Sequence, residues 1–309
     1  MFGQLFSQGG LSIDRLKNFV LVAEKGSIAR VAEGDPARQA LISRQIKELE
    51  GFFGTELTRR KGRGLALTDA GTELARQVRI HFTGLADFKA KCRDQPVEFR
   101  IAAANSLIEW VLAPAMGELA EAVPGSTFAL LDCRTADSVR GLLDHVVDFA
   151  VIRRSAVVKP LRYLALGHFG YSLFVPAAFG PDSSLDPRSM PMALTGGSDF
   201  LRQFEQAAAD STVAPRVVFR CSSFTQAAQL VRAGAAAAVL PDVAAAALAG
   251  DAVPARAAWL AGMHRDYGLA WHRQLMEIRP LAGKVRDAIR AQLATGTSTT
   301  RSSGTHREG

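Results

Sequence analysis

The sequence predicts an α+β multidomain protein: a small helical domain with a β-hairpin, one long helix, and a larger α/β region. Three patterns support this fold class. Apolar residues recur at helical spacing up to residue 53, a basic hairpin-like segment and a long amphipathic helix follow, and strand-like runs alternate with helices from Glu98 onward. With 309 residues and 48% apolar content, the chain is long enough to build two domains with cores.

Three helices are expected before residue 54. The first covers residues 14–24, and the second is short, with Ser27 as its N-cap and a break at residues 34–35. Asp35 then caps the third helix, 36–53, whose first residue is a proline that loses no hydrogen bond there. Its predicted buried side carries Leu41, Ile42, Ile46, Leu49, Phe52 and Phe53, and its other side is polar.

Two helices joined by a tight turn, the second polar on its outward side, form a helix-turn-helix, which places the second helix in the DNA major groove. Arginine and glutamine on such a helix can form paired hydrogen bonds with guanine and adenine edges, whereas serine and lysine also reach phosphates. Spacing alone is a weak signal, since any helix pair with a glycine turn imitates it. The candidate DNA-binding residues of these helices are Ser27, Arg38, Gln39, Ser43, Arg44 and Lys47.

Residues 56–68 predict a two-stranded hairpin with a basic tip, of a size and charge that suit the minor groove or the DNA backbone, like the wing of a winged helix. The wing candidates are Arg60, Lys61 and Arg63; the alternative is a solvated loop.

Thr68 is the expected cap of a long helix that ends before Pro96. Its apolar stripe is predicted to form a dimer interface, although it can also pack on its own chain. The dimerisation candidates are Leu74, Val78, Phe82 and Leu85.

From Glu98 the pattern predicts parallel sheets with helices on both faces, in two subdomains that meet near Val175-Pro176 with a cleft between them. The expected strands cover residues 99–104, 127–132, 146–153, 191–195, 216–221, 236–240 and 267–271. The polar tail, 295–309, has no apolar face and is expected to be disordered.

Ligands of such subdomains bind beyond the carboxyl ends of strands, where helix N-termini and hydroxyl groups collect polar atoms. The hydroxyl-bearing candidates can equally be plain helix caps, and the arginine can pair with a local carboxylate. The candidate effector-binding residues are Asn105, Ser106, Thr135, Arg153, Thr195, Ser222 and Thr225.

The net charge, the cysteine spacing and the motifs that are absent limit the class of protein further. The formal charge of +7 favours an anionic partner, and three widely spaced cysteines fit a reducing cytoplasm better than a disulfide framework. No signal peptide, membrane span or metal-ligand spacing is evident in the sequence, and neither are the short motifs of hydrolases, nucleotide-binding enzymes or zinc proteases. We therefore expect a cytoplasmic protein that is not an enzyme and needs no metal or cofactor.

The run from Gly26 to Gly71 resembles, without a gap, the N-terminal signature of LysR-type transcriptional regulators, above all in ISRQIKELE, FFGTEL and LTDAG. The family's DNA-contacting positions then fall on Gln39, Ser43 and Arg44, and its wing arginine on Arg60 or Lys61. The sequence departs from the family pattern at Asp35 and Arg38, where the family usually has leucine and serine, so Arg38 adds a potential guanine reader.

The resemblance implies a winged helix-turn-helix at 12–70, a dimerisation linker helix at 71–95, and an effector-binding domain at 96–294 similar to periplasmic solute-binding proteins. It implies a regulator whose DNA binding or bending is modulated by a small organic effector, such as a carboxylate, bound between two subdomains. The implied partners are double-stranded DNA, a second copy in a homodimer or homotetramer, and RNA polymerase. The alternatives are an enzyme acting in the cleft and a structural DNA-binding protein whose C-terminal region only oligomerises.

Overall fold

The computed structural model describes residues 9–61, 64–180, 186–196 and 198–295. The chain divides into two compact units. The N-terminal unit comprises Met1–Val97 with Leu143–Val146 and Gln274–Pro280, and the C-terminal unit comprises Glu98–Leu142, Val147–Arg273 and Leu281–Gly309. The wing candidate Arg63 and residues 296–309 of the predicted tail lie outside the described residues.

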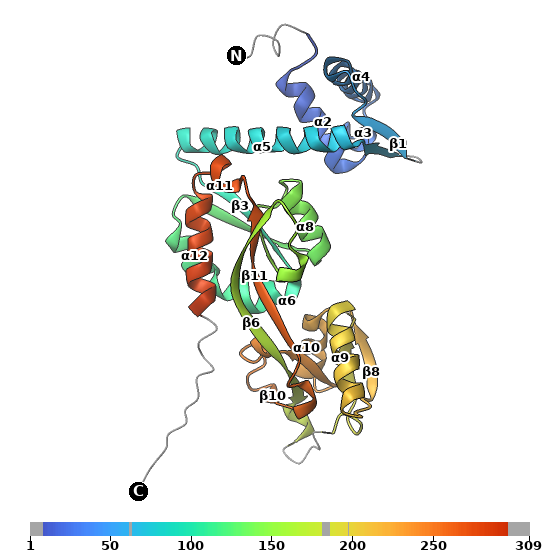
Figure 1. Cartoon of the computed structure of the whole chain (residues 1–309), viewed down its shortest axis with the longest axis vertical. Coiled ribbons are helices and arrows are strands. Elements are labelled where there is room, and N and C mark those ends of the chain that lie inside the picture. Colours follow the sequence, from blue (N-terminus) through green and yellow to red (C-terminus); the bar gives the residue numbers. More distant parts are fainter. Residues whose placement is uncertain (1–8, 62–63, 181–185, 197, 296–309) are drawn as a thin grey trace. The chain divides into compact units, whose positions relative to one another are not determined.

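The N-terminal unit is a helical domain with one antiparallel hairpin (Figure 1). Its core gathers apolar side chains of the first three helices, the hairpin base and the long helix, among them Phe19, Val22, Ile42, Leu49 and Leu57. The elements are α2 (Ile13–Lys25), α3 (Ile28–Val31), α4 (Pro36–Phe53), β1 (Thr58–Lys61), β2 (Gly64–Leu67) and α5 (Asp69–Cys92), with the short α11 (Leu275–Ile278) from the far end of the chain.

Local signals set the helix ends of this unit. The side chains of Ser27, Asp35 and Thr68 accept hydrogen bonds from backbone N–H groups at the starts of α3, α4 and α5, as the sequence predicts. Gly26 and Gly54 end α2 and α4 with φ of 63° and 66°, a conformation that favours glycine.

The C-terminal unit is a mixed α/β structure, which confirms the predicted fold class. Its first half contains β3 (Val97–Ala103), α6 (Asn105–Leu107), a π-helical turn (Ile108–Leu112), α7 (Ala113–Ala122), β4 (Ser126–Asp132), α8 (Thr135–Leu143) and β5 (Phe149–Ile152). Its remaining main elements are β6 (Leu161–Pro176), β7 (Met192–Thr195), α9 (Ser198–Asp210), β8 (Val217–Cys221), α10 (Phe224–Arg232), β9 (Ala237–Pro241), β10 (Ala252–Ala255), β11 (His264–His272) and α12 (Ala282–Thr295). In the described residues the strand order is β4-β3-β5-β11-β6-β9-β7-β8, and β10 pairs with β6.

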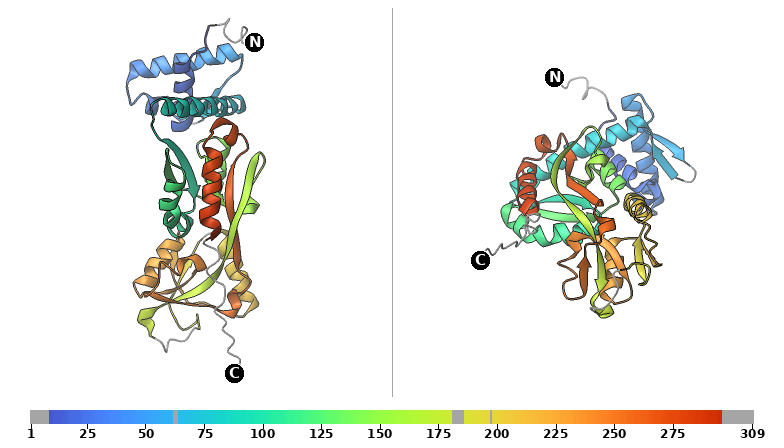
Figure 2. Two further views of the ribbon diagram at one scale, coloured as in Figure 1. Left: turned by 90° about the vertical axis from the view of Figure 1, so that its left-hand side faces the viewer. Right: turned by 60° about the horizontal axis from the view of Figure 1, so that its bottom comes forward.

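The expectation of parallel sheets is wrong for the middle of this unit. Parallel pairs occur at β3–β5, β7–β8 and β7–β9, but β6 pairs antiparallel with β11, β9 and β10, and β11 also pairs antiparallel with β5. The strands β6 and β11 run side by side through both halves (Figure 2), because the chain crosses along β6 and returns along β11. The two halves therefore share strands along this crossing, rather than meeting only at Val175-Pro176.

The strands β6 and β10 are not predicted by the sequence pattern. In β6, Gly167, His168 and Gly170 interrupt the apolar pattern, and Pro254 interrupts β10. Among the helices of the described residues, no segment is both long enough and apolar enough to cross a lipid bilayer.

Candidate functional site

The helix α4 buries one side and exposes the other. Ile42, Ile46 and Leu49 are buried in the core of the N-terminal unit, as predicted. Leu41 is 42% exposed because it lies about 100° around the helix from Ile42. Phe53 is on the same side as the three buried residues, but it is the last residue of α4 and is 39% exposed. The buried stripe is thus narrower than the sequence predicts, and more of α4 faces outward.

The outward face of α4 carries the predicted DNA-binding side chains. Gln39, Ser43 and Lys47 follow each other at four-residue steps, so they form one line along the helix. Arg44 lies beside them with its side chain 71% exposed, and its ion pair with Glu48 spans 3.8 Å. Glu48 also holds Arg15 at 2.6 Å, so Arg44 is only loosely held and is available for a partner.

Arg38 lies on a different side of α4 from Ser43 and Lys47. At about 100° per residue, it lies about 140° around the helix from Ser43. It is exposed in the first turn, and its backbone N–H donates to the capping carboxylate of Asp35. The structure therefore does not bring Arg38 together with Ser43 and Lys47.

The predicted wing is present and is fixed to α4 by a residue that the sequence analysis did not single out. One carboxylate oxygen of Glu50 accepts hydrogen bonds from the backbone N–H groups of Leu57 and Thr58 and from the Thr58 hydroxyl, at 3.0–3.1 Å. On the hairpin, Arg60 is exposed opposite Leu65, and Lys61 is the last residue of β1. Glu50 therefore ties the start of β1 to α4.

Ser27 has a structural task. Its side chain accepts a hydrogen bond from the backbone N–H of Arg30 at 3.4 Å and so caps α3. A phosphate contact at this residue stays a prediction.

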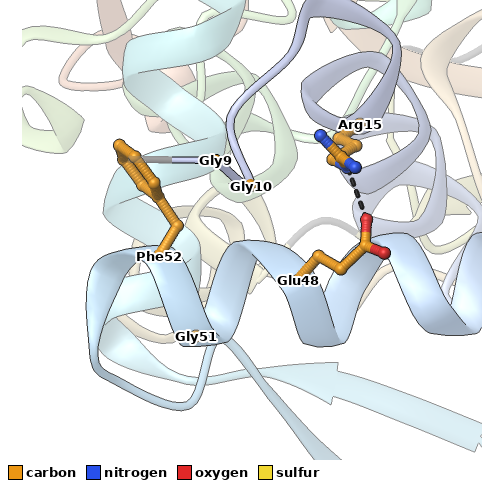
Figure 3. A pocket seen from close by; sticks show the side chains of 6 residues that line it. All are labelled: Gly9, Gly10, Arg15, Glu48, Gly51 and Phe52. Carbon is orange, nitrogen blue, oxygen red and sulfur yellow. Dashed lines mark hydrogen bonds and ion pairs between the residues drawn. The ribbon is translucent and has the colours of Figure 1, made fainter. Parts of the chain in front are cut away.

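An open cavity of about 530 Å³ lies on another part of α4 (Figure 3). Its lining is Gly9, Gly10, Arg15, Glu48, Gly51 and Phe52. The charged side chains of this lining pair with each other, and no predicted site residue takes part. The cavity therefore includes none of the predicted DNA-binding residues.

The apolar residues along α5 are buried near its start and exposed near its end. Val78 is 5% exposed in the core of its own unit, with Leu74 and Phe82 packed against that core. Leu85 and Phe88, farther along, are 58% and 65% exposed. A dimer role of the four candidates stays a prediction, but only Leu85 among them presents a large apolar surface to a second copy.

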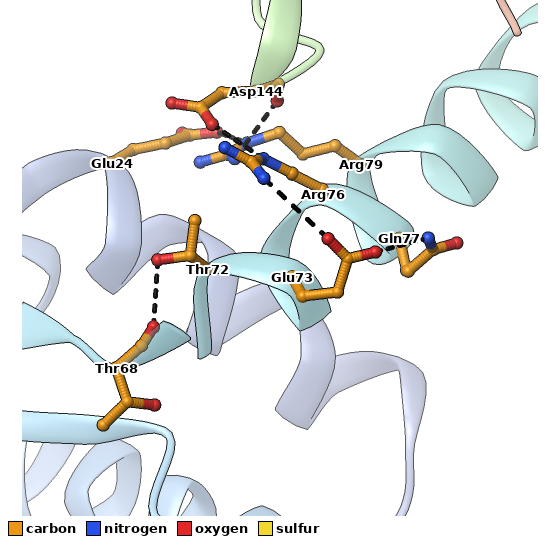
Figure 4. Close-up of polar contacts among 8 residues, drawn as sticks. All are labelled: Glu24, Thr68, Thr72, Glu73, Arg76, Gln77, Arg79 and Asp144. Atoms are coloured by element: carbon orange, nitrogen blue, oxygen red, sulfur yellow. Dashed lines mark hydrogen bonds and ion pairs between the residues drawn. The ribbon is translucent and has the colours of Figure 1, made fainter. Parts of the chain in front are cut away.

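Two arginines of α5 join three parts of the N-terminal unit (Figure 4). Arg79 Nε donates to a Glu24 carboxylate oxygen at 3.2 Å, and Arg79 NH1 donates to the backbone carbonyl of Asp144. Arg76 Nε donates to Asp144 Oδ1 at 3.0 Å. No local sequence pattern predicts this contact, because Arg76 and Asp144 lie 68 residues apart.

The effector-binding candidates lie at the starts of helices and the ends of strands, but several already have local partners. Asn105 and Ser106 begin α6, directly before the π-helical turn, and Thr135 begins α8. The backbone N–H and hydroxyl of Ser222 both donate to Gln226 Oε1 at 2.9 Å. Thr225 shares a hydrogen bond with Ser223, the cap of α10. Local structure therefore accounts for Ser222 and Thr225.

Arg153 and Thr195 differ from these. Arg153 follows the end of β5 and Thr195 is the last residue of β7, and each has a buried polar side-chain atom without a hydrogen-bond partner in the structure. Arg153 also forms an ion pair of 2.6 Å with Asp199 on α9, which the sequence analysis did not single out. This pair joins the two halves of the C-terminal unit.

Comparison with known proteins finds two family matches along the chain. Residues 13–72 match the family model "Bacterial regulatory helix-turn-helix protein, lysR family", and residues 95–294 match "LysR substrate binding domain". The transcriptional regulator DgdR of Burkholderia cepacia is 29% identical over 245 residues, which are 76% of this chain and 79% of DgdR.

Solved structures share the fold at lower identity. The full-length regulator LysG of Corynebacterium glutamicum, with its bound effector Arg, has a TM-score of 0.61 at 20% identity, covering 92% of this chain and 99% of LysG. DarR of Vibrio fischeri in complex with DNA has a TM-score of 0.54 at 18% identity, covering 91% of this chain and 98% of DarR.

Proposed function

The chain belongs to the LysR family of bacterial transcription regulators, and on that premise we propose that it binds a specific DNA sequence through α4 and the β1–β2 wing and responds to a small effector. The observation that carries the proposal is the polar side of α4, where Gln39, Ser43 and Lys47 are in line with Arg44 beside them; Lys47 and Arg44 are exposed, and Gln39 and Ser43 are half-buried. A helix with this face fits the major groove, where each base pair presents a distinct set of donors and acceptors.

A nuclease footprint tests the proposal. The full-length protein is incubated with the DNA upstream of its own and neighbouring genes, with and without a pool of small organic acids. A discrete protected region with two related halves, whose extent changes with an acid, is the expected result. Protection that no small molecule changes would instead favour a structural DNA-binding protein, and turnover of an added acid would favour an enzyme.

Replacing Arg44 with alanine is expected to weaken binding to the specific site by about 1–3 kcal/mol and to relax the preference for one base pair. The side chain is 71% exposed, so its removal should leave folding intact. Gel-shift titrations against the footprinted site and its single-base variants measure both effects. Arg140→Ala, which removes an equally exposed arginine of α8, is the control; an unchanged base preference of Arg44→Ala would contradict the assigned role.

Replacing Arg60 with alanine is expected to weaken binding about equally on specific and unrelated DNA. A phosphate contact releases counterions, so its loss lowers the slope of log affinity against log salt by about 0.9. Binding curves over a range of salt concentrations measure this slope. Arg59→Ala is a matched comparison, because neighbouring strand residues point to opposite faces of the hairpin. A loss confined to the specific sequence would speak against a backbone contact.

For Arg38, the position in the first turn of α4 favours a phosphate over a base, although the sequence alone proposes a guanine reader. The helix N-terminus and the arginine together attract an anion.

For the effector, we propose a small organic molecule, in particular a carboxylate, bound at the ends of β3, β5 and β7. Asn105, Ser106, Arg153 and Thr195 lie at these ends. The buried unpartnered atoms of Arg153 and Thr195 support this, since buried polar groups are normally paired. Thr135, Ser222 and Thr225 stay predicted members of the site, although Ser222 and Thr225 already form local hydrogen bonds.

We further propose that the protein works in the cytoplasm as a homodimer or homotetramer and contacts RNA polymerase when bound to DNA. The exposed Leu85 and Phe88 on α5 support self-association.

A further inference from the structure

Asp199 is a carboxylate shared by two arginines. Arg153, from the first half of the C-terminal unit, donates from NH1 to Asp199 Oδ2 at 2.6 Å, and Arg202, one turn along α9, pairs with Asp199 Oδ1. Burial alone would raise the pKa of Asp199, but the hydrogen bond from Arg202 and the charges of both arginines outweigh it, and the pKa lies below its ordinary value. The group is therefore ionised at neutral pH, and the three side chains together carry one positive charge.

Arg153 and Thr195, which lies four residues before Asp199 in the chain, have hydrogen-bonding capacity that the protein does not use. Nε of Arg153 is buried and has no acceptor, although NH1 of the same guanidinium is paired. The hydroxyl of Thr195, a residue 4% exposed, has no partner either. Thr195 is the last residue of β7 and Asp199 is the second residue of α9, so the two are close in the sequence. Unpaired buried donors are costly, and here they indicate a ligand with acceptor oxygens.

A carboxylate ligand and Asp199 would compete for one guanidinium. An arginine binds a carboxylate best through two parallel N–H···O bonds, which need Nε or a second terminal nitrogen. Asp199 uses NH1 of Arg153 and leaves Nε unused. The parallel pair of donors that includes Nε is Nε with NH2, so a carboxylate bound there would place a second negative charge beside Asp199, and the repulsion between the two carboxylates favours release of Asp199.

We propose that Asp199 is an internal competitor of the effector: it occupies Arg153 in the free protein, and a small carboxylate replaces it there while also bonding to the Thr195 hydroxyl. The inference rests on the effector site of the proposed function and adds its regulation. Because the Arg153–Asp199 pair joins the two halves, binding exchanges a contact between the halves for a contact to the ligand. Ligand binding is then coupled to the arrangement of the two halves, because the ligand binds better when the Arg153–Asp199 contact between them is broken.

Calorimetric titration of the full-length protein tests this. The probes are acetate, lactate, succinate and benzoate, with acetamide and benzamide as uncharged counterparts. Asp199→Asn frees Arg153 and is expected to bind at least one of these carboxylates about fivefold more tightly than the wild type. Arg153→Gln is expected to bind none of them, and no variant should respond to the amides.

Asp210→Asn is the matched control, because it neutralises a carboxylate on the same helix that bonds only locally to Gln206. It is expected to bind like the wild type. If Asp199→Asn binds every carboxylate as weakly as Asp210→Asn, or binds none, the inference is overturned, whereas a DNA footprint that still responds to an organic acid would leave the proposed function standing.

Hydrogen exchange of the wild type gives a measurement that needs no variant. A carboxylate that displaces Asp199 should increase exchange in the first turn of α9 relative to the same concentration of the amide. Slower exchange there, with Asp199 still held, would overturn the inference even if the ligand binds.

Discussion

Replacing Gly71 with alanine is expected to destabilise the N-terminal unit by about 3 kcal/mol or more. Gly71 lies in the first turn of α5, and a Cβ atom added there would stand 2.0 Å from the carbonyl oxygen of Leu57 and 2.9 Å from its carbon. These are backbone atoms, so no side-chain rotation relieves the clash. The start of α5 and the base of the wing would have to separate.

Urea unfolding followed by circular dichroism measures this loss. Gly51→Ala is the control, because Gly51 lies within α4 of the same unit and an added Cβ meets nothing within 4 Å. That change should be neutral or stabilising by up to about 1 kcal/mol, since alanine favours a helix over glycine. Equal stability of the two variants would mean that the close approach of Gly71 to Leu57 is not required for folding.

Replacing both Leu85 and Phe88 with glutamate is expected to dissociate the proposed dimer and lower DNA affinity about 100-fold or more. These side chains are 58% and 65% exposed, so their apolar surface is free to meet a second copy, and burying two carboxylates there is unfavourable. The loss on DNA follows because two linked heads bind far more tightly than one.

Sedimentation velocity and gel-shift titration measure the two effects. Ala86→Glu is a suitable control, because Ala86 is exposed on the same helix about 100° around from Leu85. A wild-type sedimentation profile of the double variant would place the interface elsewhere. Substitution of Val78 does not test the interface, because it would first disturb the core that this residue helps to form.

The structure of the helix-turn-helix domain follows closely from local sequence. The helix 36–53 was predicted with the bounds that α4 has, and the caps Ser27, Asp35 and Thr68 act as expected. Such signals act within about four residues, so sequence reasoning can detect them. The LTDAG run is a partial exception: Thr68 is recognisable as a cap, but the need for Gly71 depends on Leu57 beside it.

Side chains that join distant segments could not be predicted. Glu50 fixes the wing, Arg79 links Glu24 to Asp144, and Asp199 meets Arg153, yet none of these pairings has a local signature. Each depends on which segments the folded chain places side by side.

The sequence by itself determined the family, the helical DNA-binding head, the positions of its polar face and the α/β character of the rest, because these depend on short-range spacing and on the LysR-like run. Only the tertiary structure decided that β6 and β11 cross antiparallel between the halves, that Val78 is inside while Leu85 is outside, and that Arg153 already holds a carboxylate. The physical reason is that burial and ion pairing depend on the neighbours that a side chain acquires in space.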